Sequence, residues 1–108
     1  MSKVLPVTDA PQFAFQPQQR IALGDVNPRA VKAIDVDGDG KLDILTANDM
    51  GSVSLLLGNG DGTFLAPQTF VTGGPTRSLA VTDLNGAGKP DVVTVDNLRN
   101  QLSVLLYR

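Results

Sequence analysis

The sequence predicts an all-β fold made of two copies of one unit. The chain of 108 residues holds 11 Gly and 7 Pro, and all 11 of its acidic residues are Asp. No segment keeps a helical period over ten residues, and short apolar runs alternate with turn residues. The Asp-rich stretch 35–43 also returns as 83–91, forty-eight residues later (83 − 35). A period of that length is typical of propellers and solenoids.

Each copy holds four strand candidates in the same chain order. The first would be an outer strand, at 15–23 and again at 64–71, with a Pro-Gln pair in each. The second strand precedes the Asp-rich loop, at 29–35 and 77–83. The third follows that loop, at 44–47 and 92–95, and the fourth lies beyond the next turn, at 53–57 and 102–106. Several of these runs are apolar at consecutive positions, which indicates that both faces of the strand are covered.

Four-stranded units of forty to fifty residues that stack face to face are propeller blades. We expect an N-terminal tail over residues 1–14, a first repeat over 15–62 and a second repeat over 63–108. Two blades would leave an apolar face bare at each end, so the chain either self-assembles or is cut from a longer one. In an oligomer, the N-terminal strand of one subunit could complete the last blade of its neighbour.

The loop 35–43 has the spacing of a calcium site. Ca²⁺ takes six to eight oxygen ligands and tolerates irregular geometry. The predicted ligands are the side chains of Asp35, Asp37, Asp39 and Asp43 and the backbone carbonyl of Lys41. An EF-hand would need Glu at position twelve, where this chain has Thr46. The alternative is a solvated Asp-Gly hairpin turn.

The second loop repeats the frame with fewer ligands. Its predicted positions are Asp83, Asn85, Lys89 and Asp91. Asn85 is neutral and Ala87 offers no side-chain oxygen, so we expect a weak or empty site. The turn itself should survive, since its two glycines remain.

Three smaller features have less specific interpretations. We expect 59–62 to be a hairpin connection rather than a cation site, and 48–49 and 96–97 to be turns. Arg29 and Arg77 occupy equivalent places before a strand. They could line a channel or bind an anion, but a surface salt bridge is the favoured interpretation.

Composition argues against several functional classes. The chain has no His and no Cys, and no Ser, Lys or Asp grouping resembles an activated nucleophile, so we expect no enzyme. A net charge of −2 without a basic cluster argues against nucleic acid. No apolar run approaches the roughly 20 residues of a membrane span, and residues 1–12 lack the pattern of a signal peptide.

The stretches 35–45 and 55–64 resemble the FG-GAP/VCBS repeats of integrin-like β-propellers, and the resemblance extends over most of the chain. It implies that the Asp-rich loop joins the innermost strand to the next and binds calcium. It also implies an extracellular or cell-surface setting, with roles in adhesion, carbohydrate binding or scaffolding. Propellers of this family commonly have seven blades, an odd number that two-blade subunits cannot build. A homo-oligomer would be a trimer of six blades or a tetramer of eight.

Together these features predict a non-catalytic calcium-binding propeller module for assembly and interaction, with a protein or glycan as ligand. The alternative is a lectin-like oligomeric propeller that binds carbohydrate. Against it, the chain has no Trp and a single Tyr, Tyr107, whereas sugar sites usually offer an aromatic face.

Overall fold

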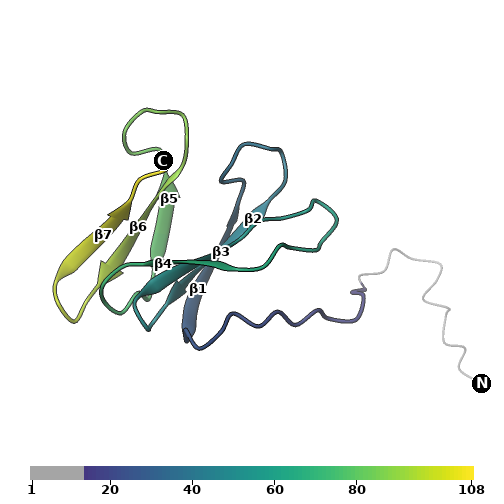
Figure 1. Cartoon of the computed structure of the whole chain (residues 1–108), viewed down its shortest axis with the longest axis horizontal. Coiled ribbons are helices and arrows are strands. Elements are labelled where there is room, and N and C mark those ends of the chain that lie inside the picture. The colour runs from purple at the N-terminus through teal and green to yellow at the C-terminus, as the bar shows by residue number, and fades with distance from the viewer. Residues whose placement is uncertain (1–13) are drawn as a thin grey trace, which may run out of the picture.

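The computed structural model describes residues 14–108, which form two antiparallel β-sheets and no helix (Figure 1). The strands are β1 (Pro28–Ile34), β2 (Asp43–Asn48), β3 (Ser52–Leu56), β4 (Gln68–Val71), β5 (Leu79–Thr82), β6 (Asp91–Asp96) and β7 (Gln101–Leu105). The prediction of an all-β fold is confirmed. The tail predicted over residues 1–14 lies outside the described residues, apart from Ala14. Within the described part of the chain, no helix could cross a membrane.

The first sheet has the order β1-β2-β3-β4 and the second the order β5-β6-β7. Within each sheet, every strand pairs with the next one in the chain through a turn or loop, so both sheets are meanders. In each sheet the strand after the Asp-rich loop, β2 or β6, is central. Both of its edges are paired, and residues on both of its faces are buried, as consecutive apolar residues predicted.

The fourth strand of the first sheet, β4, comes from the segment that begins the second sequence repeat. The sheets therefore divide within 72–78, one strand after the repeat boundary at 62 and 63. The strand expected at 15–23 does not form, and this expectation is corrected: residues 14–27 contain no strand. The physical reason is that β4, which comes from the segment 64–71, takes the place beside β3 that an outer strand would occupy in the first sheet. In Figure 1 this segment trails away on the side opposite β7.

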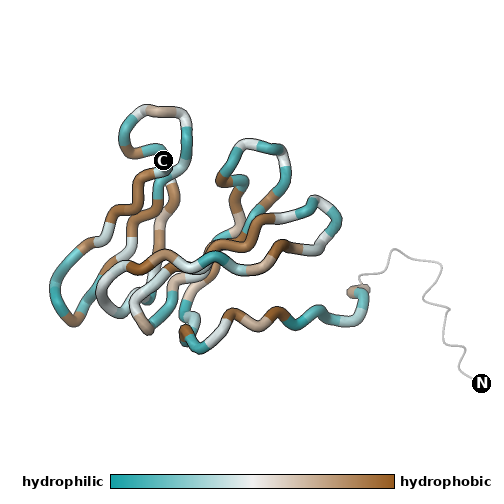
Figure 2. Tube along the Cα trace, viewed as in Figure 1, coloured by the Kyte–Doolittle hydropathy of each residue, from teal (hydrophilic) through white to brown (hydrophobic). Residues whose placement is uncertain are grey.

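The two sheets stack on different faces. We call face A the face that carries Leu45, Ala47 and Val53 in the first sheet and the equivalent residues Val93, Val95 and Leu102 in the second, and face B the opposite one. The buried apolar cluster joins face A of the first sheet to Leu79 and Val92 on face B of the second. Figure 2 shows the apolar residues gathered along the strands and the polar ones in the loops. Each fully buried Leu or Val contributes about 1.5–3 kcal/mol, so this contact holds the sheets together.

Candidate metal centre

The two Asp-rich loops project from the same side of the molecule, at the top of Figure 1. The first joins β1 to β2 and the second joins β5 to β6. Gly38 and Gly40 have φ values of +76° and +84°, and the equivalent Gly86 and Gly88 have +72° and +83°. Side chains rarely adopt this left-handed backbone, so glycine is what allows each loop to fold back on itself. The prediction that the second loop keeps the frame of the first is confirmed.

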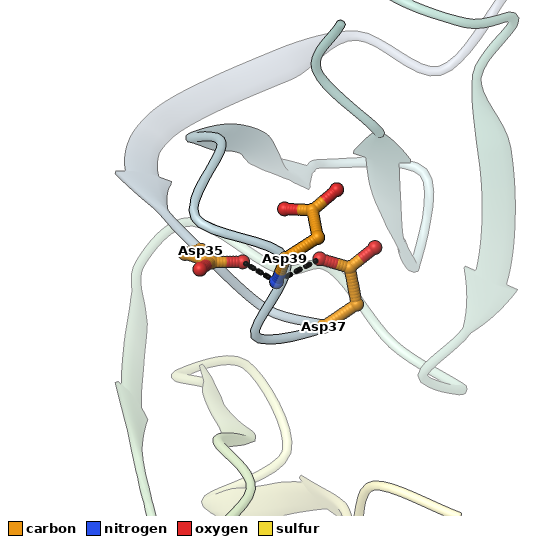
Figure 3. Close-up of side chains that lie close together, drawn as sticks. All are labelled: Asp35, Asp37 and Asp39. Atoms are coloured by element: carbon orange, nitrogen blue, oxygen red, sulfur yellow. Dashed lines mark hydrogen bonds between the residues drawn. The ribbon is translucent and has the colours of Figure 1, made fainter. Parts of the chain in front are cut away.

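Asp35, Asp37 and Asp39 converge in the first loop (Figure 3). One carboxylate oxygen from each lies within 4.8 Å of the others. Asp35 anchors the loop backbone: its Oδ1 accepts the N–H of Gly38 at 2.9 Å and of Asp39 at 3.2 Å, and its Oδ2 accepts that of Gly40 at 2.8 Å. Asp37 Oδ1 accepts one long bond, from Asp39 N at 3.4 Å. Most of the lone pairs on Asp37 and Asp39 therefore remain available to a cation.

The charges in this group are unevenly stabilised. The N–H of Gly40 is the main cause that lowers the pKa of Asp35 below its ordinary value. The pKa of Asp37 is raised, first by desolvation and then by the neighbouring carboxylates of Asp39 and Asp35. A raised pKa means that the negative form of Asp37 is disfavoured where it stands. A cation among these oxygens would reverse that, and an all-oxygen donor set suits a hard ion such as Ca²⁺.

Asp43, the fourth predicted carboxylate, occupies a different place. Its side chain is fully buried at the start of β2, and its Oδ2 accepts the N–H of Val36 at 2.9 Å. Its Oδ1 accepts the N–H of Gly58 at 2.7 Å, beyond the end of β3. The structure thus brings together three of the four carboxylates and uses Asp43 to tie the loop to the next connection. Lys41 lies in the same turn and donates its N–H to Asp39 Oδ1 at 2.9 Å.

The second loop repeats hydrogen bonds of the first but lacks the charges of Asp37 and Asp39, which are replaced by Asn85 and Ala87. Asp83 Oδ2 accepts the N–H of Gly88 at 2.8 Å, and its Oδ1 accepts that of Ala87 at 3.2 Å. The Asn85 side-chain oxygen accepts the same Ala87 N–H at 3.2 Å. Among residues 14–108, the acidic side chains close enough to share one ion are those of Asp35, Asp37 and Asp39, and they do not include Asp83.

Asp91 repeats the role of Asp43. It is buried and accepts the N–H groups of Leu84 at 2.9 Å and Tyr107 at 2.7 Å. These two bonds, that of Tyr107 first, lower the pKa of its carboxyl. Lys89 places its ammonium 5.2 Å from the centre of the Tyr107 ring, as a cation–π contact. The sequence does contain a signal for the structural role of Asp91, because this residue is kept in a loop that has lost other acidic side chains.

The connection after β3 is a turn, as predicted. Asn59 N–H bonds to the Thr63 carbonyl at 2.9 Å, and Gly58 pairs with Phe64. Asp61 Oδ1 accepts both the hydroxyl and the N–H of Thr63, at 2.6 and 2.9 Å, and the hydroxyl bond chiefly lowers its pKa. Its carboxylate is thus engaged within its own turn.

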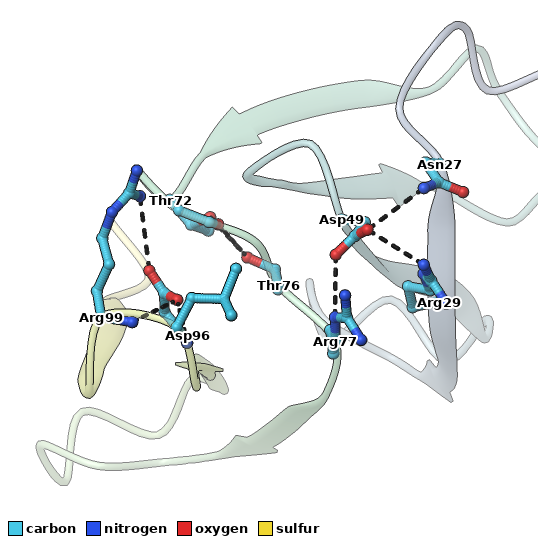
Figure 4. Close-up of polar contacts among 10 residues, drawn as sticks. Asn27, Arg29, Asp49, Thr72, Thr76, Arg77, Asp96 and Arg99 are labelled. Atoms are coloured by element: carbon cyan, nitrogen blue, oxygen red, sulfur yellow. Dashed lines mark hydrogen bonds and ion pairs between the residues drawn. The ribbon is translucent and has the colours of Figure 1, made fainter.

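Arg29 and Arg77 bind the same carboxylate (Figure 4). Arg29 Nη2 lies 3.2 Å from Asp49 Oδ2, and Arg77 Nε lies 3.1 Å from Asp49 Oδ1. The salt-bridge interpretation of the two arginines is confirmed. Asp49 therefore links the two sheets, because Arg29 belongs to β1 and Arg77 precedes β5. This link was not predicted from the sequence. The equivalent residue of the second repeat is Asn97, which carries no charge.

Comparison with known families agrees with this geometry. A family model described as an FG-GAP-like repeat matches residues 35–94, which include both Asp-rich loops and strands β2 to β5. No curated protein and no solved structure matches the chain. The matched span covers 60 of 108 residues (94 − 35 + 1), more than half of the sequence. The chain therefore belongs to the FG-GAP-like repeat family.

Proposed function

We propose that the chain is a calcium-stabilised β-propeller-type module that serves interaction rather than catalysis. The observation that supports it most is the convergence of Asp35, Asp37 and Asp39 within 4.8 Å, in a repeat of this family. The lack of His and Cys supports a non-catalytic role, because the usual general base and thiolate are missing.

The cation would be held by these three carboxylates, with the Lys41 carbonyl and water as further ligands. A bound Ca²⁺ would supply positive charge that offsets the repulsion among the carboxylates. The chain's own part is to pre-form the turn through the N–H groups that Asp35 accepts. Calcium is favoured over magnesium because Mg²⁺ demands near-ideal octahedral geometry and seldom takes an all-protein cage.

Thermal melting in calcium and in chelator tests this proposal. We expect chelation to lower the melting temperature of the wild-type chain. The double substitution Asp37→Ala with Asp39→Ala should remove that difference, and in chelator it should melt no lower than the wild type, because repulsion is relieved. Asn85→Ala is the matched control, since it changes the equivalent of Asp37 in the other loop and removes no charge. A wild-type melting curve indifferent to calcium would contradict the proposal.

Carbohydrate binding is the competing function. The single tyrosine, Tyr107, is 39% exposed, and the Lys89 ammonium lies over its ring. This leaves less of the ring for stacking on a sugar. Calorimetric titration with simple sugars distinguishes the two functions, and saturable heat at millimolar sugar would favour the lectin-like role.

A further inference from the structure

The second Asp-rich loop contains an Asn-Gly pair, Asn85-Gly86, and the turn after β3 contains another, Asn59-Gly60. Such a pair can react with itself, because the glycine nitrogen can attack the asparagine side-chain amide and displace ammonia. Glycine favours this attack, since it has no Cβ to shield its nitrogen. Both pairs are exposed, so neither sequence nor burial distinguishes them. The bonds around each pair do.

The backbone nitrogen of Gly86 is not engaged by its loop. In the first loop, Asp35 accepts the N–H of Gly38 at 2.9 Å and that of Gly40 at 2.8 Å. Gly86 is the equivalent of Gly38, yet its N–H has no acceptor among residues 14–108. Space is also open around it, because a Cβ added to Gly86 would meet no atom within 4 Å. The nucleophile of the reaction is therefore available in the folded chain.

The side chain of Asn85 is folded back along its own backbone. Its Oδ1 accepts the N–H of Ala87, two residues on, at 3.2 Å, which is an Asx turn. This bond lays the amide along the peptide that contains the Gly86 nitrogen. It also withdraws electron density from Cγ, the carbon to be attacked. Both partners of the reaction are thus prepared by the fold of the loop.

Asn59 is held in a different way. Its Nδ2 donates to the Thr63 hydroxyl at 2.9 Å, and its N–H donates to the Thr63 carbonyl, also at 2.9 Å. These bonds direct the amide across the turn rather than toward the nitrogen of Gly60. The side chain of Lys41 lies against Gly60, with its Cγ 3.2 Å from where a Cβ would stand. The folded chain therefore protects this pair and leaves the other one open.

We propose that Asn85 is a site of spontaneous deamidation. The Gly86 nitrogen gives its proton to water and bonds to Asn85 Cγ, while the Cγ–Nδ2 bond breaks and ammonia leaves, so that a succinimide ring closes. Water then opens the ring at either carbonyl. One opening gives aspartate, and the other gives isoaspartate, in which the main chain runs through the former side chain. Each conversion adds one negative charge. This modification goes beyond the role proposed above and requires no bound cation.

The aspartate product has a carboxylate where the first loop has Asp37. Asn85 Oδ1 and Asp83 Oδ1 both accept the N–H of Ala87, each at 3.2 Å. The new charge is therefore created beside an existing one. Deamidation thus gives the weaker copy of the loop a charge pair that its sequence does not encode.

Ageing of the purified full chain in mildly alkaline buffer tests the proposal, because base removes the proton from the attacking nitrogen. Anion-exchange chromatography follows the added charge, with Asn85→Asp as the standard for the aspartate product. Peptide mapping by mass spectrometry locates the change. We expect Asn85 to convert several-fold faster than Asn59 in the folded chain. In urea the two should convert at similar rates, since only the shared Asn-Gly sequence then remains.

Two variants separate the folded contacts from the sequence. Asn85→Gln should abolish the main acidic product, because the longer side chain forms the corresponding ring far more slowly. Thr63→Val removes the hydroxyl that holds the Asn59 amide. It should raise the rate of conversion at Asn59 several-fold and leave the rate at Asn85 unchanged.

Equal rates at Asn59 and Asn85 in the folded chain would overturn the proposal. So would an Asn85 that stays intact in the folded chain for the time in which urea allows full conversion. An unchanged Asn59 rate in Thr63→Val would also count against it, since the bonds around each pair would then not decide which one reacts. None of these measurements involves calcium, so their outcome is independent of the metal proposal.

Discussion

Asp43 and Asp91 occupy equivalent places at the base of the two Asp-rich loops and make the same pair of hydrogen bonds. Asp43 accepts the N–H of Val36 at 2.9 Å and of Gly58 at 2.7 Å. Asp91 accepts the two equivalent N–H groups, also at 2.9 and 2.7 Å. The second loop keeps this arrangement after losing other acidic side chains, so in both loops this residue fastens the loop to the sheet.

The first prediction follows from this fastening. Asp43→Ala leaves two buried N–H groups without an acceptor and should lower the free energy of unfolding by about 3 kcal/mol. The loss should be of similar size in calcium and in chelator, as measured by urea unfolding. Asp91→Ala is the companion variant and should also destabilise in both buffers. A loss confined to calcium would show that Asp43 acts as a metal ligand instead.

The second prediction concerns the pH dependence of calcium binding. The pKa of Asp37 is raised above 3.8, so on acidification it takes up a proton before an ordinary Asp does. A ligand must be deprotonated, so calcium affinity should fall as pH drops from about 7 towards the carboxylate range. Without calcium the contribution of Asp37 to stability has the opposite sign: it is lost as pH rises from 3.8 through the raised pKa of this carboxyl.

Calcium titrations across this range, with Asp37→Asn as the comparison, check the second prediction. The variant should bind more weakly at neutral pH and show a shallower decline on acidification, because it has no proton to displace. An identical pH profile for the two proteins would assign the pH dependence to another carboxylate.

The third prediction concerns the link between the sheets. Asp49→Asn removes both ion pairs, and the arginine side chains are 45% and 48% exposed, so the loss should be about 1 kcal/mol. The difference from wild type should shrink at about 1 M salt, where charges are screened within about 3 Å. Unfolding in low and high salt measures this, and a difference that does not change with salt would point to packing rather than charge.

The fourth prediction concerns Gly58. A Cβ at this position would collide with the carbonyl oxygen of Leu42, a backbone atom that cannot turn away. Gly58→Ala should therefore cost about 1–3 kcal/mol and disturb the bond to Asp43. Gly74→Ala is the comparison, because its Cβ would meet the side chains of Asp96 and Arg99, which can move once Asp96 gives up its bonds to the N–H groups of Leu98 and Arg99. Equal losses in the two variants would contradict this distinction between backbone and side-chain collisions.

Much of the candidate site could be predicted from the sequence, because its determinants are local. Asp35, Asp37 and Asp39 lie within five residues, and the glycines between them allow the turn that brings their oxygens together. The role of Asp43 could not be predicted in this way, since its second bond runs to Gly58, fifteen residues away. The spacing of the Asp residues predicted that Asp43 binds a cation, whereas in the folded chain its carboxylate accepts two backbone N–H groups.

By itself the sequence determined the all-β class, the two repeats, the Asp-rich loops and the membership of the FG-GAP-like family. Each of these depends on short-range patterns: the alternation of turns and apolar runs, and a period that returns after 48 residues. Only the tertiary structure decided where the sheets divide, that residues 15–23 form no strand and that Asp49 joins two arginines. A strand exists only where the fold lays it against a neighbouring backbone, and an ion pair only where the fold brings distant charges together.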